Sequence, residues 1–193
     1  MYSKVVVPLD GSKLGEVALP HLEAIAQKFD VSEIFLVSVT AKLKGMIQQD
    51  KVFDMPSPRA DTPSPVKIAT VQTGVIISAI LREGSLEIPL TLGKMAKTAF
   101  DYLYRKGKQL DQKGFNVSIH VLIGNPAEEL LKFVEEQKAD LIVMASKGRS
   151  GLSRWDMSNI ARKVVSAAKV PVMVVKPGPD FKETKPKRKG VAS

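Results

Sequence analysis

The chain has 193 residues, 44% hydrophobic and 25% charged, the balance of a globular domain with a sizeable core. It contains no cysteine, which excludes disulfides, thiolate metal sites and a cysteine nucleophile. The amino-terminal apolar run is too short for a signal peptide, and the longest one, 74–81, is far below the roughly 20 residues that span a bilayer. We therefore expect a cytoplasmic protein without membrane association.

The net charge of +9 is unevenly distributed along the chain. The last 13 residues hold five lysines and arginines against one glutamate, and almost no apolar residue. We therefore expect residues 178–193 to form a disordered basic tail. Such a tail can bind polyanions such as nucleic acid. A solvated, solubilising tail explains the same composition, and we favour that interpretation.

Five short apolar runs rich in Val and Ile predict buried strands. Most are nearly continuous, which suits parallel strands covered on both faces, whereas the run at 117–123 alternates as an edge strand does. In chain order the expected strands are 4–8, 33–39, 117–123, 140–145 and 170–175. Helical patterns lie between them, so the sequence predicts a parallel α/β sheet with right-handed crossovers.

Four helices are expected in the intervals. The first covers 14–29, where Pro20 predicts either a kink or irregular first turns. The second, about 92–113, is expected to turn Met95, Ala99, Leu103 and Leu110 inward. The third starts at Asn125, a good N-cap residue before Pro126. The stripe of the fourth is Met157, Ile160, Ala161, Val164, Val165 and Ala168.

Residues 41–91 interrupt the alternation of strands and helices. Four prolines between 55 and 65 predict an extended segment, and the following residues are more apolar. We expect an inserted arm that packs on the body, on a partner subunit or over a crevice as a lid, and the sequence does not choose among these. The predicted organisation is an α/β domain at 1–177, containing this insertion, and the tail at 178–193.

Ligands of open parallel sheets bind beyond the carboxyl ends of the strands. Asp10 follows the first strand, and the small-residue loop 145–151 follows the fourth and leads toward a helix. Small residues let the backbone approach a phosphate, and N–H groups at a helix start attract anions. If the two strands are neighbours, both loops face one crevice.

These segments, in this order, resemble the universal stress protein family. The matching pieces are 5–12, 125–128, 139–144, 146–153 and 170–175. The resemblance implies a Rossmann-like fold with five parallel strands in the order 3-2-1-4-5, helices on both faces and a long insertion after strand 2. It also implies a homodimer in which the fifth strands, 170–176, meet.

One branch of that family binds ATP through a loop that reads Gly, two residues, Gly, nine residues, Gly, then Ser or Thr. The corresponding positions here are Ala145, Gly148, Ser158 and Asn159, so only the second glycine is kept. Alanine at 145 costs little if its φ is negative, and of order 1 kcal/mol or more if φ is positive. We expect the Ser158 N–H to face outward, and the Ser158 hydroxyl and Asn159 amide to be available as phosphate donors.

The resemblance also implies roles for individual residues. Asp10 and its backbone would hold the ribose and adenine, with Val39 and Met144 lining the base and Pro8 and Leu9 shaping the same wall. Lys147, Arg149 and Arg154 can add cationic contacts to a polyphosphate. The ligand would be ATP or another adenine nucleotide, with or without Mg. The predicted binding residues are Pro8, Leu9, Asp10, Val39, Met144, Ala145, Gly148, Arg149, Gly151, Ser158, Asn159 and Ile160.

Other interpretations of these residues stay open. Ser158 and Asn159 can merely cap the last helix, and Asp10 the first. His21 and His120 have no triad pattern around them, and two histidines without cysteine leave little for a transition-metal site, so we expect no enzyme. The competing function is an interaction module of the same fold that has lost nucleotide binding and uses the insertion to contact an unidentified protein.

Overall fold

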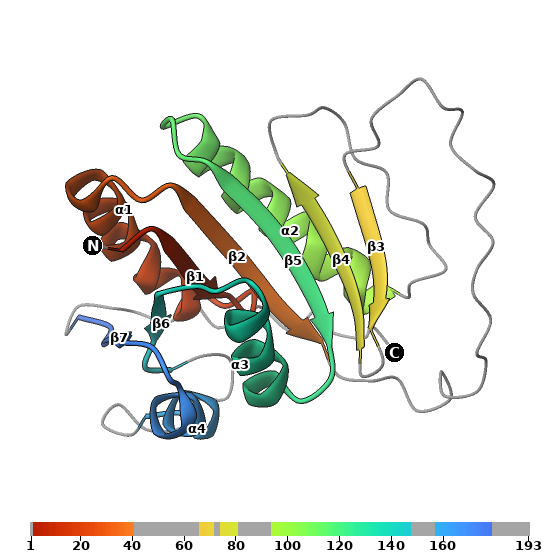
Figure 1. Ribbon diagram of the computed structural model, residues 1–193. Helices are drawn as coiled ribbons and strands as arrows, with labels where there is room; N and C mark the ends of the chain where they lie inside the picture. Colours follow the sequence, from red (N-terminus) through yellow and green to blue (C-terminus); the bar gives the residue numbers. More distant parts are fainter. Residues whose placement is uncertain (1, 41–65, 72–73, 81–93, 148–156, 179–193) are drawn as a thin grey trace, which may run out of the picture.

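Five parallel strands form the centre of the structure, a computed structural model that describes residues 2–40, 66–71, 74–80, 94–147 and 157–178 (Figure 1). The strands are β1 (Lys4–Pro8), β2 (Glu33–Thr40), β5 (Val117–Ile123), β6 (Leu141–Ala145) and β7 (Val172–Val175). Their spatial order is β5-β2-β1-β6-β7, with every neighbouring pair parallel. The predicted order 3-2-1-4-5 is therefore confirmed.

A hairpin from the insertion extends this sheet. It consists of β3 (Val66–Val71) and β4 (Gly74–Ile80), and β4 pairs antiparallel with β5. The complete sheet has seven strands in the order β3-β4-β5-β2-β1-β6-β7. The prediction of an edge strand at 117–123 is wrong, because β5 is hydrogen-bonded on both sides. This part of the arm packs on the body, whereas the proline-rich part, within 41–65, lies outside the described residues.

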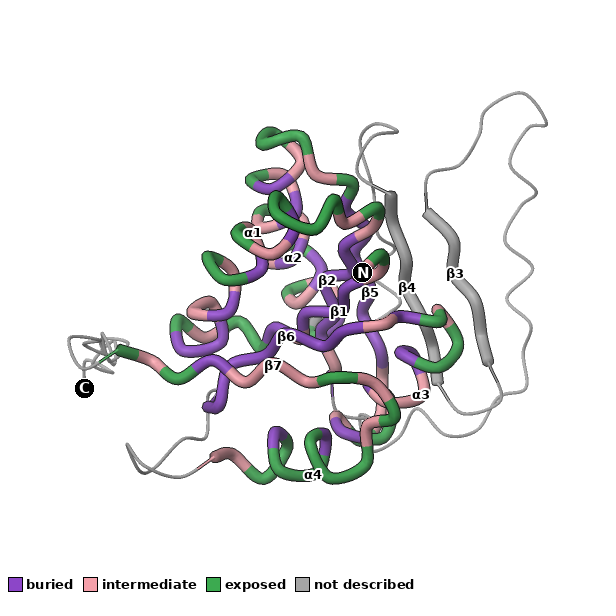
Figure 2. Tube along the Cα trace, turned by 60° about the vertical axis from the view of Figure 1, so that its left-hand side comes forward, coloured by how far each residue is buried: buried purple, intermediate pink, exposed green. Residues whose placement is uncertain are grey.

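Helices cover both faces of the sheet, as predicted (Figure 1). Their bounds are η1 (Gly15–Val17), a 3₁₀ turn, followed by α1 (Ala18–Phe29), α2 (Lys94–Asp111), α3 (Pro126–Glu136) and α4 (Asn159–Ala167). Successive strand residues point to opposite faces, so Val5 and Val7 pack under α1 and α2, while Val6 packs under α3 and α4. The strands at the centre are accordingly buried almost throughout (Figure 2).

Local sequence explains how two of the helices begin. Pro20 is the third residue of α1, where its missing N–H has no intrahelical partner to lose. The 3₁₀ turn before it confirms the second alternative for this segment, irregular first turns. The Asn125 side chain accepts a hydrogen bond from the Ala127 N–H at 3.2 Å, with Pro126 in the first turn, so the predicted cap of α3 is confirmed.

The predicted inward faces need correction at three positions. Met95 is 52% exposed, because the buried stripe of α2 starts one residue later. That stripe is Ala96, Phe100, Leu103 and Leu110. Ile160 and Val165 are 40% and 45% exposed, since α4 touches the sheet near its β7 edge through a narrower stripe centred on Ala161 and Val164. Among the described residues, no helix is both long and apolar enough to cross a bilayer.

Candidate functional site at the carboxyl edge of the sheet

The neighbouring strands β1 and β6 bring two predicted loops to one edge of the sheet. Val5 pairs with Leu141 and Val6 with Ile142, and the two strands are parallel. Asp10 and Lys147 therefore both follow carboxyl ends at the same side of the fold. This is the position at which open parallel sheets bind ligands.

The loop after β1 is held by its own polar groups. Asp10 Oδ1 accepts hydrogen bonds from the Ser12 N–H at 3.0 Å and the Ser12 hydroxyl at 2.6 Å. The Ser12 Oγ in turn accepts from the Gly15 N–H at 3.0 Å, which starts the helical segment. A Cβ on Gly15 would lie 2.8 Å from Asp10 Oδ1, so the small residue lets the carboxylate approach. Asp10 therefore does not cap the first helix itself, because neither η1 nor α1 has a side-chain cap; it orients Ser12, and the residue remains exposed.

A charged cluster supports this loop from α2. The Glu16 carboxylate forms ion pairs with Lys106 Nζ at 2.9 Å and Lys13 Nζ at 3.3 Å. It also accepts a hydrogen bond from the Tyr102 hydroxyl at 3.3 Å. Burial alone would raise the pKa of Glu16, but hydrogen bonds and charges from Lys106 and Lys13 outweigh it and lower that pKa. Burial, followed by the negative charges of Glu16 and Asp10, raises the pKa of Tyr102. The Asp10 loop is therefore anchored to the face that α1 and α2 cover.

Ala145 is the last residue of β6 and pairs with Val175. Among the described non-glycine residues, a positive φ occurs at Asp30 and Lys138 and not at Ala145. Of the two alternatives for Ala145, the one without a positive φ therefore holds, and replacing the family glycine by alanine adds a methyl group without backbone strain. Ser158 has φ −59° and ψ 154°, an extended conformation that any residue can adopt.

Both the backbone N–H and the hydroxyl of Ser158 form hydrogen bonds within the chain. Its N–H donates to the Ser146 carbonyl at 2.8 Å, so the expectation that this N–H faces outward is wrong. Its hydroxyl accepts from the Ala161 N–H at 3.1 Å and caps α4. Asn159 Oδ1 accepts a hydrogen bond from the Arg162 side chain. The β6 end is thus tied directly to the start of α4, through Ser146 and Ser158.

Lys147 differs from every other lysine of the described chain. The residue is 6% exposed, and within the described part of the structure its Nζ is buried without a hydrogen-bond partner. A buried ammonium ordinarily needs pairing, because desolvation costs several kcal/mol. From the sequence, Lys147 was predicted only as one of three cations near the loop, and nothing in the residue pattern indicated its burial.

The remaining predicted residues fall into three groups. Pro8, Val39 and Met144 lie on the α3/α4 face: Val39 packs against the core cluster that contains Met144, and Pro8 follows Val6 by two positions. Leu9 belongs instead to the core under α1 and α2, so the structure does not bring all predicted wall residues to one face. Gly148, Arg149 and Gly151, like Arg154, lie outside the described residues.

Four residues of this region were not predicted from the sequence: Ser12, Glu16, Tyr102 and Lys106. The Asp10-Gly11-Ser12 spacing could have indicated the Ser12 contact, since an aspartate often accepts from the N–H two residues later. No local signal could have paired Glu16 with Lys106, which lies 90 residues further along the chain. Only the packing of α2 beside η1 and α1 brings them together.

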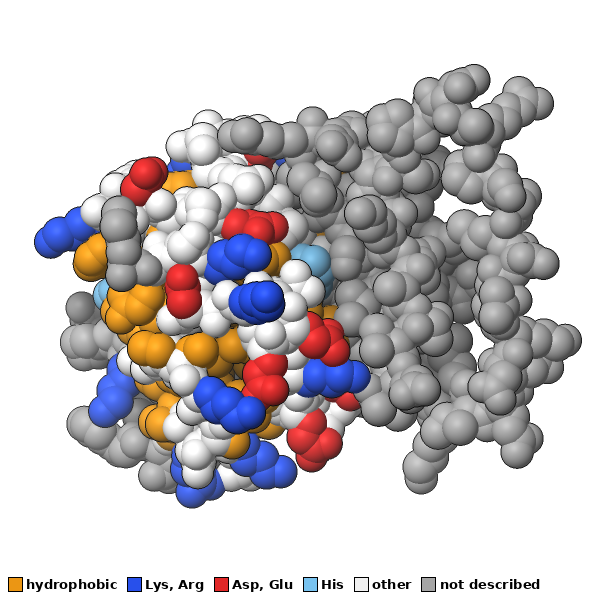
Figure 3. Space-filling view, viewed as in Figure 1, with side chains coloured by type: hydrophobic (Ala, Val, Ile, Leu, Met, Phe, Trp, Pro, Cys, Tyr) orange, Lys and Arg blue, Asp and Glu red, His pale blue; other side chains and the backbone are white. Residues whose placement is uncertain are grey.

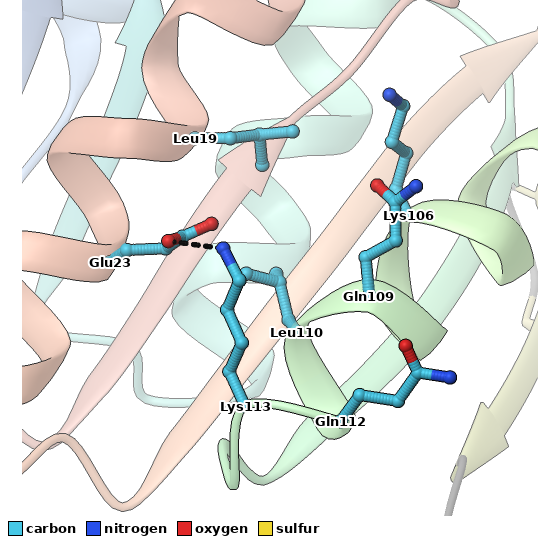
Figure 4. A pocket seen from close by; sticks show the side chains of 7 residues that line it. All are labelled: Leu19, Glu23, Lys106, Gln109, Leu110, Gln112 and Lys113. Carbon is cyan, nitrogen blue, oxygen red and sulfur yellow. Dashed lines mark hydrogen bonds and ion pairs between the residues drawn. The ribbon is translucent and has the colours of Figure 1, made fainter.

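A hollow lies between α1 and α2 (Figure 4). Leu19 and Leu110 line it together with Glu23, whose carboxylate is 2.6 Å from Lys113 Nζ. Lys106, Gln109 and Gln112 complete the lining. Its paired charges make it a weaker candidate than the carboxyl edge. Among the described residues, no group of three His, Asp or Glu side chains could hold a metal ion.

His120 is a buried base with a structural explanation. Its ring centroid lies 4.6 Å from that of Phe133 and 5.6 Å from that of Phe35, and its Nε2 is 3.1 Å from the Ser118 hydroxyl. Burial lowers the pKa of His120 from 6.5 to about 3, so the imidazole is neutral near pH 7. It belongs to the core under α3, as its neighbours show.

Comparisons with known proteins agree with the fold. The universal stress protein MJ0531 of Methanocaldococcus jannaschii is 30% identical over 176 residues, covering 91% of this chain and 83% of that protein. The structure of MJ0577, from the same organism, aligns with a TM-score of 0.64 at 22% identity, over 92% of this chain and 98% of the other. The Arabidopsis thaliana protein At3g01520, solved with AMP bound, aligns with a TM-score of 0.54 at 15% identity, over 92% and 94%.

The sequence model of the universal stress protein family matches residues 1–176, which include the whole parallel sheet and the hairpin that extends it. That match spans far more than half of the chain, and the β1, β6 and α4 segments that form the candidate site all lie within it. The chain belongs to the universal stress protein family.

Proposed function

We propose that this chain binds an adenine nucleotide, ATP in the first place, at the carboxyl edge formed by β1, β6 and α4. The observation that carries the proposal is the backbone at Ala145 and Ser158. Both family glycines are replaced, yet neither position needs the left-handed conformation that favours glycine. The family resemblance and the AMP bound to the Arabidopsis structure support an adenine nucleotide as the ligand class.

In this proposal the nucleotide lies across the β1–β6 boundary. The Asp10 loop and the Val39 side would hold the sugar and base, and the start of α4 would face the phosphates. Helix starts attract anions, because the first N–H groups have no intrahelical acceptor. The module acts by binding rather than turnover, and nucleotide state changes which surfaces it offers to partners.

The test is thermal unfolding with and without millimolar Mg-ATP. Binding to the folded state raises stability by RT ln(1 + [L]/Kd), about 2.7 kcal/mol at a hundredfold excess over Kd. We expect a clear rise in Tm for the wild type and a much smaller rise for Asp10→Ala. Asp101→Ala, an exposed carboxylate on α2, is the matched control and should keep the full shift.

A second candidate function is an interaction module without nucleotide, favoured by the internal use of the Ser158 N–H and hydroxyl. Absence of any Tm shift with ATP, ADP and AMP would support it and overturn nucleotide binding. Both candidates share the proposed homodimer through β7, one of the two edge strands of the described sheet.

Apolar residues beside β7 support that dimer. Figure 3 shows hydrophobic side chains on the side of the molecule that carries β7 and α4, with lysines and arginines nearby. Ile160 and Val165 on α4 are exposed, and Val172, Met173 and Val174 of β7 are half-buried. We expect light scattering to give a dimer mass for the wild type and a monomer mass for Met173→Arg. An unchanged mass for the variant would overturn this interface.

A further inference from the structure

The strongest unexplained group in the described chain is the Lys147 ammonium. It is the one buried side-chain polar atom within the described residues that has no hydrogen-bond partner. Ordinary core packing does not explain it, because a methionine or leucine would fill similar space without burying a charge. Ion pairs satisfy comparable lysines elsewhere in the fold, such as Lys106 with Glu16.

A second anion-attracting feature lies next to Lys147. Ser146, its neighbour, holds the Ser158 N–H through its carbonyl, so the backbone at Lys147 and the start of α4 are adjacent. The Ser158 hydroxyl satisfies the Ala161 N–H, which leaves the N–H groups of Asn159 and Ile160 without an acceptor inside the helix. An ammonium and a nine-residue helix N-terminus at one sheet edge favour a negatively charged ligand group.

We propose that Lys147 is the charge partner of the ligand's phosphate and makes this site select phosphorylated nucleotides over uncharged nucleosides. This inference rests on the proposed nucleotide function and assigns one residue to one part of the ligand. The unpaired ammonium destabilises the empty protein, and the phosphate satisfies it. Lys147 therefore links ligand charge to stability.

The test uses calorimetric titration of wild type and Lys147→Met with ATP, AMP and adenosine, together with the Tm of each unliganded protein. We expect Lys147→Met to weaken ATP at least about tenfold, the loss expected from removing a charge-assisted contact, and to change adenosine affinity less than about twofold. The unliganded variant should melt at a higher temperature than the wild type. Lys147→Gln removes the charge but keeps a polar end, and serves if the methionine variant does not fold.

Lys163→Met is the matched control, because it removes the same charge from an exposed position on α4. It should leave ATP affinity within about twofold. Equal losses for ATP and adenosine in Lys147→Met would assign the residue to general structure and overturn the inference. An unchanged ATP affinity would overturn it as well.

A separate probe distinguishes failure of this inference from failure of the proposed function. If the wild type binds no adenine compound, the nucleotide proposal is wrong, and tripolyphosphate alone becomes the ligand tested by thermal shift. A shift in the wild type that disappears in Lys147→Met and persists in Lys163→Met would keep Lys147 as an anion-binding residue. No shift with tripolyphosphate would overturn that role too.

Discussion

Two lysines in this protein, Lys106 and Lys147, are similarly shielded from water but differ in what surrounds their charge. Lys106 keeps 17% of its side chain exposed, and its Nζ lies 2.9 Å from Glu16. Lys147 is 6% exposed, and its Nζ has no partner within the described chain. The chain itself provides the counter-charge in the first case, and in our proposal a ligand provides it in the second.

The same contrast separates the two halves of the candidate site. On the β1 side, Asp10, Ser12 and Gly15 form a closed set of hydrogen bonds before any ligand arrives. On the β6 side, the start of α4 and the Lys147 ammonium both favour an anion. A nucleotide, with a neutral base and charged phosphates, matches this division of the site.

His120 is a buried base that we do not assign to the binding site. Its contribution to the pH dependence of the free energy of unfolding is the largest effect we expect. Its pKa is about 3 in the folded protein and 6.5 ordinarily, so between these pH values the unfolded chain binds a proton that the folded chain does not. This contribution to stability is complete above pH 6.5 and is lost as the pH falls toward 3. Linkage gives a loss of about 2 kcal/mol between pH 7 and pH 5.

Urea unfolding at the two pH values measures that loss. His120→Leu should reduce the pH dependence by about 2 kcal/mol, whatever its effect on absolute stability, while ATP affinity at pH 7 stays unchanged. His21→Gln, which replaces an exposed histidine on α1, is the control and should keep the wild-type dependence. A pH dependence unaltered in His120→Leu would show that the buried imidazole is not responsible.

Lys106→Met and Lys147→Met should change the free energy of unfolding in opposite directions. Removing Lys106 leaves the largely buried Glu16 carboxylate with weaker partners, so we expect a loss of about 1–2 kcal/mol at pH 7. Lys147→Met should instead stabilise the unliganded protein. Urea unfolding under identical conditions measures both changes in the free energy of unfolding. Two changes of the same sign would mean that the two lysines do not differ in how their charge is satisfied.

A double-mutant cycle with Glu16→Gln isolates the Lys106 pair. The lowered pKa of Glu16 also fixes where this pair matters: its contribution is present above the ordinary carboxyl pKa and is lost as the pH falls through the lower, folded value. The Glu16→Gln variant should therefore lose less stability than the wild type on acidification below about pH 4.5.

The sequence was a good guide where the signal is local. Short apolar runs rich in Val and Ile predicted the five parallel strands, and Asn125 with Pro126 predicted the start of α3. It failed where distant segments decide. The alternation at 117–123 indicated an edge strand, but β4 of the upstream hairpin pairs with β5, and no pattern within β5 indicates that neighbour.

The candidate site shows the same limit. Its position at the ends of β1 and β6 followed from strand order, because adjacent parallel strands place their loops together. The direction of the Ser158 N–H did not follow, since it depends on a contact with Ser146 across the loop. The unpaired state of Lys147 depends on what is absent around it in three dimensions, which residue spacing does not encode.

Gly11→Ala tests how far the β1 half of the site is preformed. Gly11 has φ of +79°, and a Cβ there would meet nothing within 4 Å, so the expected cost is purely conformational, about 1 kcal/mol. Gly178→Ala, also in open space but without a positive φ, is the control and should change the free energy of unfolding by less than about 0.5 kcal/mol. Equal effects of the two changes would mean that the loop is not held in the left-handed conformation.

Lys113→Met should give the smallest change in the free energy of unfolding. It extends the comparison to a lysine that is paired but exposed. Its Nζ is 2.6 Å from Glu23, yet half of its side chain lies in water, where ion pairs contribute about 0.2–1 kcal/mol and are screened by salt. Urea unfolding at low and high salt should show a small loss that shrinks as salt rises. The loss from Lys106→Met should persist, because its partner is shielded. If both losses vanish with salt, then burial does not separate these two pairs, and the Glu16 cluster counts as ordinary surface charge.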